Sequence, residues 1–504
     1  MSVRVRYAPS PTGLQHIGGV RTALFNYFFA RSSGGRFVLR IEDTDRDRYD
    51  EAALNDIYET FEWLGIHWDE GPDVGGAYGP YVQSERVELY RRHAMELLEN
   101  GVAYKAYETP EELEAMREKG GYDRSSRDLT PEQRAAYEAE GRVPVIRFKV
   151  PLEGETVFDD VVLGRVKRKN KDIPADPVLL KSDGLPTYHL ANVIDDHYMQ
   201  ITHILRAQEW VPSGALHVLL YDAFGWEPPG YCHLPMVMGK DGQKLSKRHG
   251  ATSAIEFRRQ GYLPEAIINY VTLLGWAYDD QTEFFTVSDL EELFSIERIN
   301  KSPAVFDYKK LEWFNGVYIR QKTDDELEEL VLPYLKEAGL ISSLPTEEQL
   351  SILRGALPLI RERLKVLSDA PGLVRFLFEE IGDYEVTEAI PKKHTAEQAL
   401  ALLEESERLL EGFDERDDEE NESLFRRRAE ELEVKIGNLL MPLRVAVTGS
   451  RVSPPLFGSI RLLGADRAKE RVSYAKGRLR EQVHAVSSDS AAGDRAGQTG
   501  KKEG

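Results

Sequence analysis

The sequence predicts an α/β domain at the amino end of the chain, an α+β insertion within it, and all-helical domains after it. Three observations support this prediction. Strand, helix and strand patterns alternate up to Asp45, the stretch 102–183 breaks that rhythm with charged helical pieces and strand pairs, and helical periodicity dominates beyond Gly250. At 504 residues the chain exceeds what one core can support, so we expect at least three domains.

The opening segment has the pattern of a βαβ unit. We expect a strand at Val3–Ala8, a loop at Pro9–Gly19, a helix at Val20–Arg31 and a second strand at Phe37–Ile41. The second strand delivers Glu42, Asp43 and Asp45 at its carboxyl end. Ligands collect at the carboxyl ends of strands in open parallel sheets, so this edge is a candidate site.

The same patterns predict the elements that follow. Helices are expected at Ala52–Leu64 and Ser84–Asn100, with Ser84 as an N-cap, and strand pairs around Val143–Val150 and Thr156–Val166. Strand and helix patterns resume from Tyr188 to Phe224, and Pro264 begins a further helix. The last segment, 486–504, is rich in Ser, Gly and Ala without periodicity, and we expect it to be disordered.

Composition excludes several classes of protein. The chain is 41% hydrophobic and 30% charged, and no stretch approaches the roughly 20 apolar residues of a membrane helix. Ser2–Tyr7 alternates Val with Arg as a strand does and does not resemble a signal peptide. The single cysteine, Cys232, excludes internal disulfides and thiolate metal sites, so we expect a cytoplasmic protein.

The formal charge of −21 argues against a protein that coats nucleic acid, because such binding depends on Lys and Arg neutralising phosphates. Any contact with nucleic acid must then be local. The run Arg165–Lys171 is one basic segment that could make it. This run either faces nucleic acid or is a solvated hairpin tip, and the sequence leaves both interpretations open.

The loop Ala8–Gly19 has the composition of a ligand-binding turn. Its glycines let the backbone pass close to a bulky ligand, and the following helix N-terminus offers unpaired N–H groups and a partial positive charge to phosphate. His16 can donate a hydrogen bond to a phosphoryl oxygen. A glycine-rich turn alone is a weak signal, because ordinary turn chemistry explains most of them.

A second segment strengthens this interpretation. Lys244 and Lys247 flank Ser246 in a loop that follows Gly239 and Gly242. Two ammonium groups three residues apart can enclose a triphosphate and stabilise the charge that develops on its oxygens in the transition state. Either segment alone could be a solvated surface loop, but their joint occurrence predicts one nucleotide site.

These two segments resemble the "HIGH" and "KMSKS" signatures of class I aminoacyl-tRNA synthetases, and the lead-in Ser10–Gly13 resembles that of the bacterial glutamyl group. The resemblance covers residues 1 to about 485. Further stretches similar to the same group are Arg40–Asp45, Asp69–Asp73, Leu179–Asp196, Val305–Arg320 and Met441–Phe457.

The resemblance implies a domain organisation and a reaction. A Rossmann-type catalytic domain at 1–101 and 184–250 would be split by an acceptor-stem-binding insertion at 102–183. A stem-contact domain at 251–322 and a helical anticodon-binding domain at 323–485 would follow. In the reaction, the α-carboxylate of L-glutamate attacks the α-phosphorus of ATP, with Mg²⁺ present, and the acyl group then passes to the 3′-terminal adenosine of tRNA(Glu).

The resemblance also implies roles for individual residues. The catalytic residues would be His16, Lys244 and Lys247, and the ATP contacts would be Gly18, Gly19, Glu209 and Lys247. Glutamate brings two carboxylates and an ammonium group, so its pocket needs cationic forks and an acceptor. Arg6 and Arg206 resemble the carboxylate binders and Glu42 resembles the acceptor. The remaining polar contacts would be Ser10, Tyr188 and Asn192.

Two positions depart from related patterns. The first signature ends in Gly19 and not in a second histidine, which is usual for the glutamyl group. Some glutamyl enzymes carry zinc in the insertion, but Tyr104–Thr109 and Tyr122–Asp128 contain neither Cys nor His. We therefore predict no zinc and no other protein metal site.

In the helical part, Arg363 resembles the arginine that distinguishes tRNA for glutamate from tRNA for glutamine, and Arg444 resembles another anticodon contact. We expect a monomer without a membrane partner, and whether tRNA(Gln) is also charged stays open. The alternatives are a shortened relative that glutamylates a base in tRNA, a glutaminyl-tRNA synthetase, a nucleotidyltransferase and a non-catalytic tRNA-binding protein. The long helical part argues against the first, Ser10–Gly13 against the second and the intact Lys244–Arg248 against the last.

Overall fold

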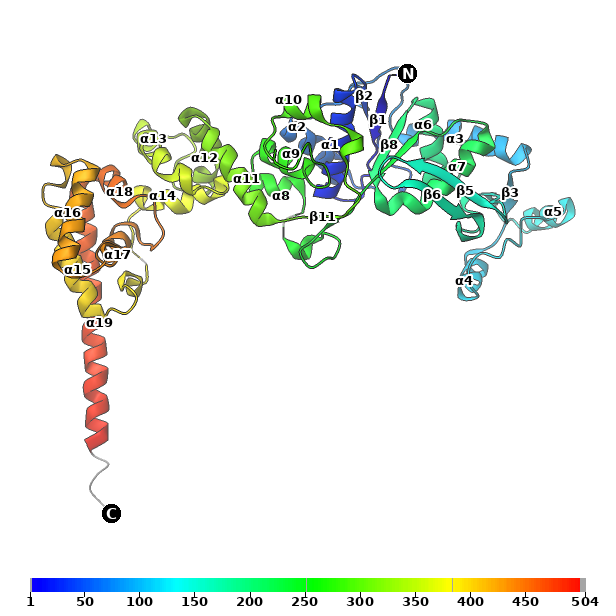
Figure 1. Cartoon of the computed structure of the whole chain (residues 1–504). Coiled ribbons are helices and arrows are strands. Elements are labelled where there is room, and N and C mark those ends of the chain that lie inside the picture. Colours follow the sequence, from blue (N-terminus) through cyan, green and yellow to red (C-terminus); the bar gives the residue numbers. More distant parts are fainter. Residues whose placement is uncertain (1, 251, 383, 499–504) are drawn as a thin grey trace, which may run out of the picture. The chain divides into compact units, whose positions relative to one another are not determined.

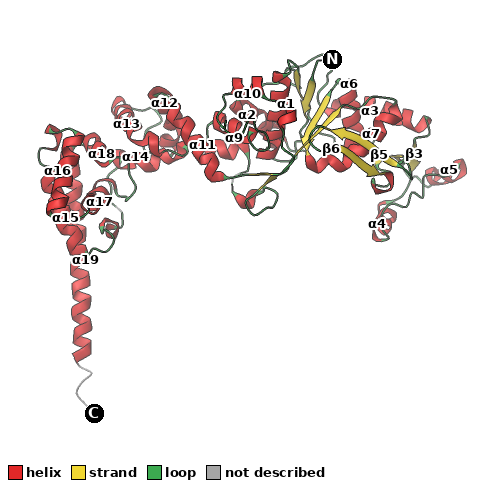
Figure 2. Cartoon of the chain, viewed as in Figure 1, coloured by secondary structure: helices red, strands yellow, loops and turns green. Residues whose placement is uncertain are grey.

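A computed structural model describes residues 2–250, 252–382 and 384–498, except for the side chains of Lys247 and of 485–498. The chain divides into two compact units, Met1–Leu311 and Glu312–Gly504 (Figure 1). The strands that the structure describes all lie in the first unit, and the described part of the second unit contains only helices (Figure 2). The predicted order of an α/β part before an all-helical part is therefore confirmed.

The first unit begins with the predicted βαβ unit. The strands β1 (Arg4–Tyr7) and β2 (Arg36–Leu39) pair in parallel, and α1 (Ile17–Ser32) connects them. Apolar side chains are buried on all sides of α1, because strands cover one side of it while α9 (Pro264–Thr272) and α10 (Val287–Leu293) cover the other. Full burial explains why this helix has no polar stripe.

A second parallel pair continues this layer. The strands β8 (His203–Ala207) and β9 (Gly230–Leu234) pair in parallel, and the backbone N–H of Thr202 donates to the carbonyl of Arg4 at 2.9 Å, which joins β8 to β1. The helices α6 (Tyr188–Tyr198) and α7 (Val211–Phe224) pack against it. The core between them includes Leu190, Ile194, Ile204, Leu216, Leu220 and Tyr231.

The predicted insertion contributes to two different sheets. The strands β3 (Ala103–Ala106), β4 (Val145–Phe148) and β7 (Val178–Leu180) form a sheet of their own, and α4 (Pro110–Glu118) and α5 (Pro131–Ala139) lie between β3 and β4 in the chain. The hairpin of β5 (Glu155–Asp160) and β6 (Gly164–Lys169) instead joins β9 and β8 in the order β6-β5-β9-β8.

The basic run Arg165–Lys171 lies mainly on β6 and not at a hairpin tip, so that interpretation was wrong. Each residue from Arg165 to Lys169 pairs with a residue of β5, and the turn itself is formed by residues 161–163. The strand is the outer one of its sheet, and most of its long basic side chains are exposed. Charged side chains on an edge strand discourage pairing with another strand.

Asp176 contacts both of the stretches that contain neither Cys nor His, Tyr104–Thr109 and Tyr122–Asp128. Its side chain is fully buried and accepts hydrogen bonds from Tyr104 Oη at 2.9 Å and from the backbone N–H of Val150 at 3.1 Å. Arg124 pairs with the same carboxylate at 3.3 Å. Within the described residues, no group of three or more His, Cys, Asp or Glu side chains is placed to hold a metal ion.

The helices after β2 differ from the prediction at one end. The helix α2 (Glu51–Leu64) lies as expected, but α3 spans Val87–Glu99 and follows a 3₁₀ turn, η1, at Gln83–Arg86. Ser84 is therefore not an N-cap. The turn is held by other contacts, because the backbone N–H of Ser84 donates to Asp43 at 2.8 Å and Gln83 and Arg86 donate to Asp195.

The rest of the first unit closes around α1. The short strand β10 (Val237–Met238) pairs in parallel with β11 (Ala304–Val305), with α8 (Ala254–Arg259) between them in the chain. Pro264 begins α9, as predicted. None of the helices in the described part of the chain combines the length and apolar character that a membrane crossing needs.

The described part of the second unit is a set of helices that pack against one another. Its longer helices are α12 (Asp324–Glu337), α13 (Glu347–Ile360), α15 (Ala396–Leu409), α16 (Asp418–Glu431), α17 (Ile436–Thr448) and α19 (Ala465–Gln498). The helices α15, α17 and α19 contact one another, and each has a fully buried side chain: Leu403, Leu443 and Val472 respectively. The N-cap threonines of α12, α13 and α15 each form a capping box.

The disorder predicted at 486–504 stays a prediction. The helix α19 continues to Gln498, and residues 499–504 lie outside the described part. Packing of Ala468, Val472 and Leu479 anchors the earlier turns, and each further residue then adds a hydrogen bond without a new nucleation cost.

We predict that Asp176→Ala lowers the free energy of unfolding by about 2–4 kcal/mol, because it removes the buried acceptor of the Tyr104 hydroxyl and of the Val150 N–H, and the ion pair with the partly exposed Arg124. Urea unfolding at pH 7 measures this. Asp128→Ala is the control, since Asp128 is exposed on the same segment and should change stability by no more than about 0.5 kcal/mol. Equal effects for both variants would contradict the prediction.

Candidate active site

One cleft of about 950 Å³ in the first unit gathers the predicted site residues. Its walls follow the carboxyl ends of β1, β2, β8 and β9, as expected for an open parallel sheet. The predicted residues that line it are Arg6, Ser10, His16, Gly18, Gly19, Glu42, Tyr188, Asn192, Arg206, Glu209 and Lys244. The side chain of Lys247, also predicted, lies outside the described part of the structure.

The two signature segments are joined by backbone hydrogen bonds. The N–H of Ile17 donates to the carbonyl of Thr252 at 2.8 Å, and the N–H of Ala254 donates to the carbonyl of Gln15 at 2.9 Å. These bonds form an antiparallel bridge between His16 and Ser253. The chain that leaves the lysine loop is therefore held against the glycine-rich loop, although the two are more than 200 residues apart.

His16 is the N-cap of α1. Its Nδ1 accepts from the backbone N–H groups of Gly18 at 3.1 Å and Gly19 at 3.4 Å. The sequence predicted these N–H groups to be unpaired and free for phosphate, and this was wrong, because the imidazole itself occupies them. Desolvation and the nearby Lys244 lower the pKa of His16. A neutral imidazole that accepts at Nδ1 carries its hydrogen at Nε2, where it can donate to a ligand.

The structure explains why the signature ends in glycine. A Cβ at Gly19 would lie 2.8 Å from Tyr7 Oη and 3.2 Å from Gln15 Oε1. Tyr7 Oη donates a hydrogen bond to Gln15 Oε1 at 2.5 Å, and Asp56 accepts a hydrogen bond from the backbone N–H of Gln15 at 2.5 Å. A histidine at position 19 would have to displace this buried group of bonds.

The lysine loop is held in place by its own side chains. Lys244 Nζ lies 2.5 Å from Glu209 Oε2, so two residues predicted to contact one nucleotide form an ion pair. His249 Nδ1 accepts from the N–H of Ser246 at 3.0 Å, and His249 Nε2 lies 3.1 Å from Asp241. Both side chains of the Lys244–Glu209 pair are partly exposed, so a polyanion can replace the Glu209 carboxylate as the partner of Lys244.

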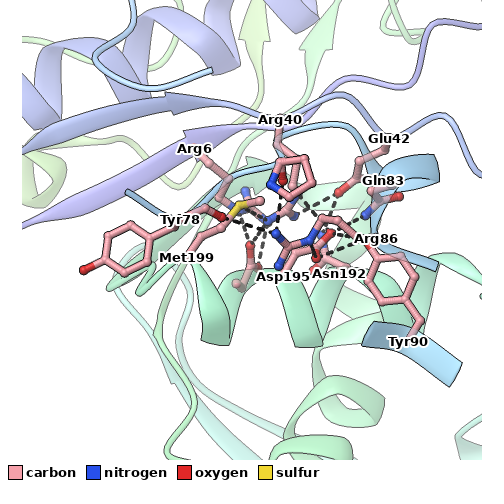
Figure 3. A network of polar contacts seen from close by, with 12 residues as sticks. Arg6, Arg40, Glu42, Tyr78, Gln83, Arg86, Tyr90, Asn192, Asp195 and Met199 are labelled. Carbon is pink, nitrogen blue, oxygen red and sulfur yellow. Dashed lines mark hydrogen bonds and ion pairs between the residues drawn. The ribbon is translucent and has the colours of Figure 1, made fainter. Parts of the chain in front are cut away.

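A buried ionic network lies next to the cleft (Figure 3). Arg40 is fully buried and donates to Asp196 Oδ1 at 2.7 Å and to Glu42 Oε1 at 2.9 Å. Arg6 donates from Nε and Nη2 to the two oxygens of Asp196 at 2.9 and 3.2 Å. Asn192 donates to Glu42 at 3.2 Å, so Glu42 is fixed from two sides.

Asp195, the neighbour of Asp196 on α6, connects this network to α3. It accepts from Gln83 at 2.9 Å, Arg86 at 2.7 Å and Tyr90 at 2.8 Å (Figure 3). Three guanidinium groups thus face three carboxylates: Arg6, Arg40 and Arg86 against Glu42, Asp195 and Asp196. Sequence reasoning assigned no role to Arg40 or this acidic pair. The available signal was two adjacent aspartates that follow the apolar residues Val193 and Ile194.

The network shifts the pKa values of its carboxyl groups in opposite directions. Burial raises the pKa of Glu42, although Arg40 opposes it. Burial also raises the pKa of Asp196, but Arg6 and Arg40 outweigh burial, and the net shift is downward. Of Glu42 and Asp196, Glu42 is therefore the carboxylate that a cationic ligand group would stabilise more.

Arg206 does not take part in this network of ion pairs. It is 5% exposed and donates to His233 Nε2 at 3.0 Å, Tyr188 Oη at 3.2 Å and the carbonyl of Trp210 at 3.2 Å. None of these acceptors is a carboxylate, and the described part of the chain places no carboxylate within ion-pair distance of it. The cleft therefore contains a nearly buried cation whose charge the protein does not neutralise.

The two arginines predicted in the second unit lie near each other. Arg363 is exposed at the end of η6 (Arg361–Arg363), and Arg444 on α17 donates to Ser453 and to the carbonyl of Pro454. Burial, together with the charge of Arg363, lowers the pKa of Arg444. In the described residues neither arginine forms an ion pair with a carboxylate. Two neighbouring cations without counter-charges suit an anionic partner.

The sequence matches two family models. Residues 2–313 match the model described as tRNA synthetases class I (E and Q), catalytic domain, and residues 326–476 match an anticodon binding domain. The glutamate–tRNA ligase of Borreliella burgdorferi is 56% identical over 487 residues, which cover 95% of this chain and 99% of that protein. The glutamate–tRNA ligase of Treponema denticola is 53% identical over 94% of this chain and 99% of its own length.

Solved structures agree with the sequence relatives. A glutamate–tRNA ligase from Elizabethkingia meningosepticum, in complex with its amino acid, superimposes with a TM-score of 0.80 at 34% identity and covers 95% of this chain and 100% of that one. A glutamate–tRNA synthetase from Elizabethkingia anophelis gives a TM-score of 0.81 at 35% identity with the same coverage. The predicted Rossmann-type catalytic domain with helical C-terminal domains is confirmed.

We predict that Asp196→Asn lowers the free energy of unfolding at pH 7 by about 3–5 kcal/mol, because two buried guanidinium groups lose their partner. The pKa of Asp196 is lowered on folding, so its contribution is complete at neutral pH and is lost as the pH falls below about 5. The variant should therefore lose less stability than the wild type on acidification. Urea unfolding between pH 7 and about pH 2.5, a range that extends below the unfolded-state pKa of about 4, measures both effects.

The exposed residue Asp47 provides the control for this prediction, since Asp47→Asn should follow the wild type at every pH. A steeper loss of stability in Asp196→Asn than in the wild type on acidification would contradict the assigned sign.

Proposed function

Because this chain belongs to the glutamate–tRNA ligase family of class I tRNA synthetases, we propose that the cleft of its first unit is where glutamate is activated with ATP and passed to tRNA(Glu). The chain is an aminoacyl-tRNA-forming ligase. The observation that carries the proposal for the cleft is the backbone pairing of Gln15–Ile17 with Thr252–Ala254, which brings both signature segments to one cavity.

The nucleotide belongs on the side of the cleft lined by His16 and Lys244. The Nε2–H of His16 donates to a phosphoryl oxygen, and the ammonium groups of Lys244 and Lys247 stabilise charge on the triphosphate as the bond to pyrophosphate breaks. When the triphosphate of ATP enters, Lys244 pairs with it and leaves Glu209. The side chain of Glu209 then contacts the nucleotide. Mg²⁺ arrives with the phosphates, and Asp45 and Glu209 are the cleft carboxylates that could hold it.

The amino acid belongs on the side lined by Glu42 and Arg206. The α-carboxylate must stay free to attack the α-phosphorus, so the unbalanced Arg206 is better used on the side-chain carboxylate. Glu42 accepts from the ammonium group, and Ser10, Tyr188 and Asn192 complete the polar wall. Arg6 contributes mainly through Asp196, since its fork is already occupied by that carboxylate.

The helical unit supplies the tRNA contacts proposed for Arg363 and Arg444. Their neighbouring, unbalanced charges support contact with a nucleic acid, and a guanidinium can read a base edge in an unstacked loop. We further propose that the chain acts in the cytoplasm, where its tRNA substrate is used, and that it acts as a monomer without zinc.

The proposal is tested by aminoacylation of purified tRNA with ATP and Mg²⁺, supplying glutamate or glutamine. We expect glutamate to be charged and glutamine to be rejected. Charging of glutamine, or of neither amino acid, would refute the proposed function.

In the same assay Lys247→Ala should lower kcat by about 10²–10³-fold, because a cation that stabilises the transition state is removed.

Lys240→Ala is the matched control for Lys247→Ala. Lys240 belongs to the same loop but pairs with Asp307 at 2.9 Å and does not line the cleft. We expect the kcat of Lys240→Ala to stay within about twofold of the wild type and its stability to be unchanged, since substitution of an exposed residue rarely alters stability. A normal kcat for Lys247→Ala would remove that residue from the mechanism.

We predict that Arg363→Gln increases charging of tRNA(Gln) relative to tRNA(Glu) by about tenfold, because one arginine–base contact accounts for about 1–3 kcal/mol of discrimination. The ratio of kcat/KM for the two tRNAs measures this. Arg361→Gln serves as the control, since Arg361 is engaged by Asp324 and should leave the ratio unchanged. An unchanged ratio in Arg363→Gln would exclude the residue from anticodon reading.

A further inference from the structure

A buried chain of hydrogen bonds leads from the cleft to the β5–β6 hairpin. Arg206 donates from Nε to Nε2 of His233 at 3.0 Å, and Nδ1 of His233 lies 2.6 Å from Asp160 Oδ2. His233 is on β9 and Asp160 ends β5, and neither side chain has exposed surface or lines the cleft. These two residues can act on a ligand only through Arg206.

The geometry fixes the tautomer of His233. Asp160 Oδ1 accepts from the backbone N–H groups of Val162 at 2.9 Å and Leu163 at 2.8 Å, while Oδ2 accepts from the N–H of His233 at 3.0 Å. A carboxylate can only accept, so Nδ1 of His233 must carry the hydrogen that faces Oδ2. Its Nε2 is then left as an acceptor, which is what Arg206 requires.

The same geometry keeps the imidazole uncharged. Burial lowers the pKa of His233 more than the bond to Asp160 raises it, and the nearby Arg206 adds to the lowering. The guanidinium of Arg206 is thus held firmly by neutral groups, and its positive charge is not consumed by the residues that orient it. Arg6 differs in this respect, because Asp196 both orients and neutralises it.

We propose that Asp160 and His233 are positioning residues that hold Arg206 for the side-chain carboxylate of the amino acid and so determine the preference for glutamate over glutamine. This inference rests on the proposed function. A carboxylate in the pocket neutralises Arg206, whereas the amide of glutamine leaves a nearly buried cation without a counter-charge, which costs free energy. The discrimination depends on Arg206 keeping both its place and its charge.

Asp160→Asn tests the proposal without changing side-chain volume. Each oxygen of Asp160 faces two N–H groups, so the NH₂ group of the introduced amide opposes two donors in either orientation: those of Val162 and Leu163, or the backbone N–H and Nδ1–H of His233. The first orientation opens the turn after β5, and the second forces the hydrogen of His233 onto Nε2, where it opposes the N–H of Arg206, so both disturb the support of Arg206. We expect the KM for glutamate to rise by about tenfold or more, and the preference for glutamate over glutamine in kcat/KM to fall by at least as much.

The KM for ATP separates this effect from general damage and should stay within about twofold of the wild type. Asp176→Asn is the matched control, since Asp176 is also a fully buried carboxylate that accepts a backbone N–H but lies in the separate β3-β4-β7 sheet. It should leave the KM for glutamate unchanged. An unchanged KM for glutamate in Asp160→Asn, or an equal rise in both variants, would overturn the proposal.

A second measurement needs no variant. In the wild-type protein labelled with ¹⁵N-histidine, the resonances of His233 should show a protonated Nδ1 and an unprotonated Nε2 at pH 7. A protonated Nε2 would overturn the assignment even if Asp160→Asn failed to fold. If the wild type does not charge tRNA with glutamate, the proposed function fails. If it does, and His233 or Asp160→Asn behaves otherwise than stated, only this inference fails.

Discussion

The arrangement of the cleft depends on two backbone hydrogen bonds between segments that are more than 200 residues apart. The pairing of Gln15–Ile17 with Thr252–Ala254 positions the end of the lysine loop against the start of α1. Backbone bonds of this kind are insensitive to side-chain identity, so they fix the approach of the two segments while leaving their side chains free for chemistry. The capping of α1 by His16 follows from the same contact, because it places residue 16 in an extended conformation outside the helix.

The second constraint is electrostatic. Burying Arg40, Asp195 and Asp196 is costly unless every charge is paired, and the network pairs them within α6, η1 and the strand ends. This pairing fixes the side chain of Glu42, and Asp196 neutralises the charge of Arg6. Arg206 takes no part in these ion pairs. The cleft therefore keeps a positive charge for a negative ligand, although the net charge of the chain is −21. The overall charge of the molecule and the charge of its site are thus independent quantities.

Local patterns predicted the local parts of the fold well. The βαβ opening, the start of α9 at Pro264 and the helical second unit follow from periodicity and capping, which act over a few residues. The resemblance to a known family placed the predicted cleft residues of the first unit, and their convergence in one cavity agrees with it. Sequence reasoning missed one local feature, the occupation of the Gly18 and Gly19 N–H groups by His16, because an imidazole is not one of the usual N-cap side chains. Two further misses were non-local: the partners of Asp195 and the joining of the β5–β6 hairpin to β9. Each depends on which distant segment lies alongside, and neither composition nor spacing contains that information.

The position of the hairpin has a consequence for the whole first unit. A predicted insertion would ordinarily be expected to fold by itself and to touch the cleft only at its edges. Here the turn after β5 is closed by Asp160, and the same carboxylate sets the hydrogen position on His233. The turn after β5 and the imidazole that accepts from Nε of Arg206 are therefore both held by one side chain. Since β6 is the outer strand of this sheet and carries most of the exposed basic run, that run and the strand that bears Arg206 belong to one continuous hydrogen-bonded sheet.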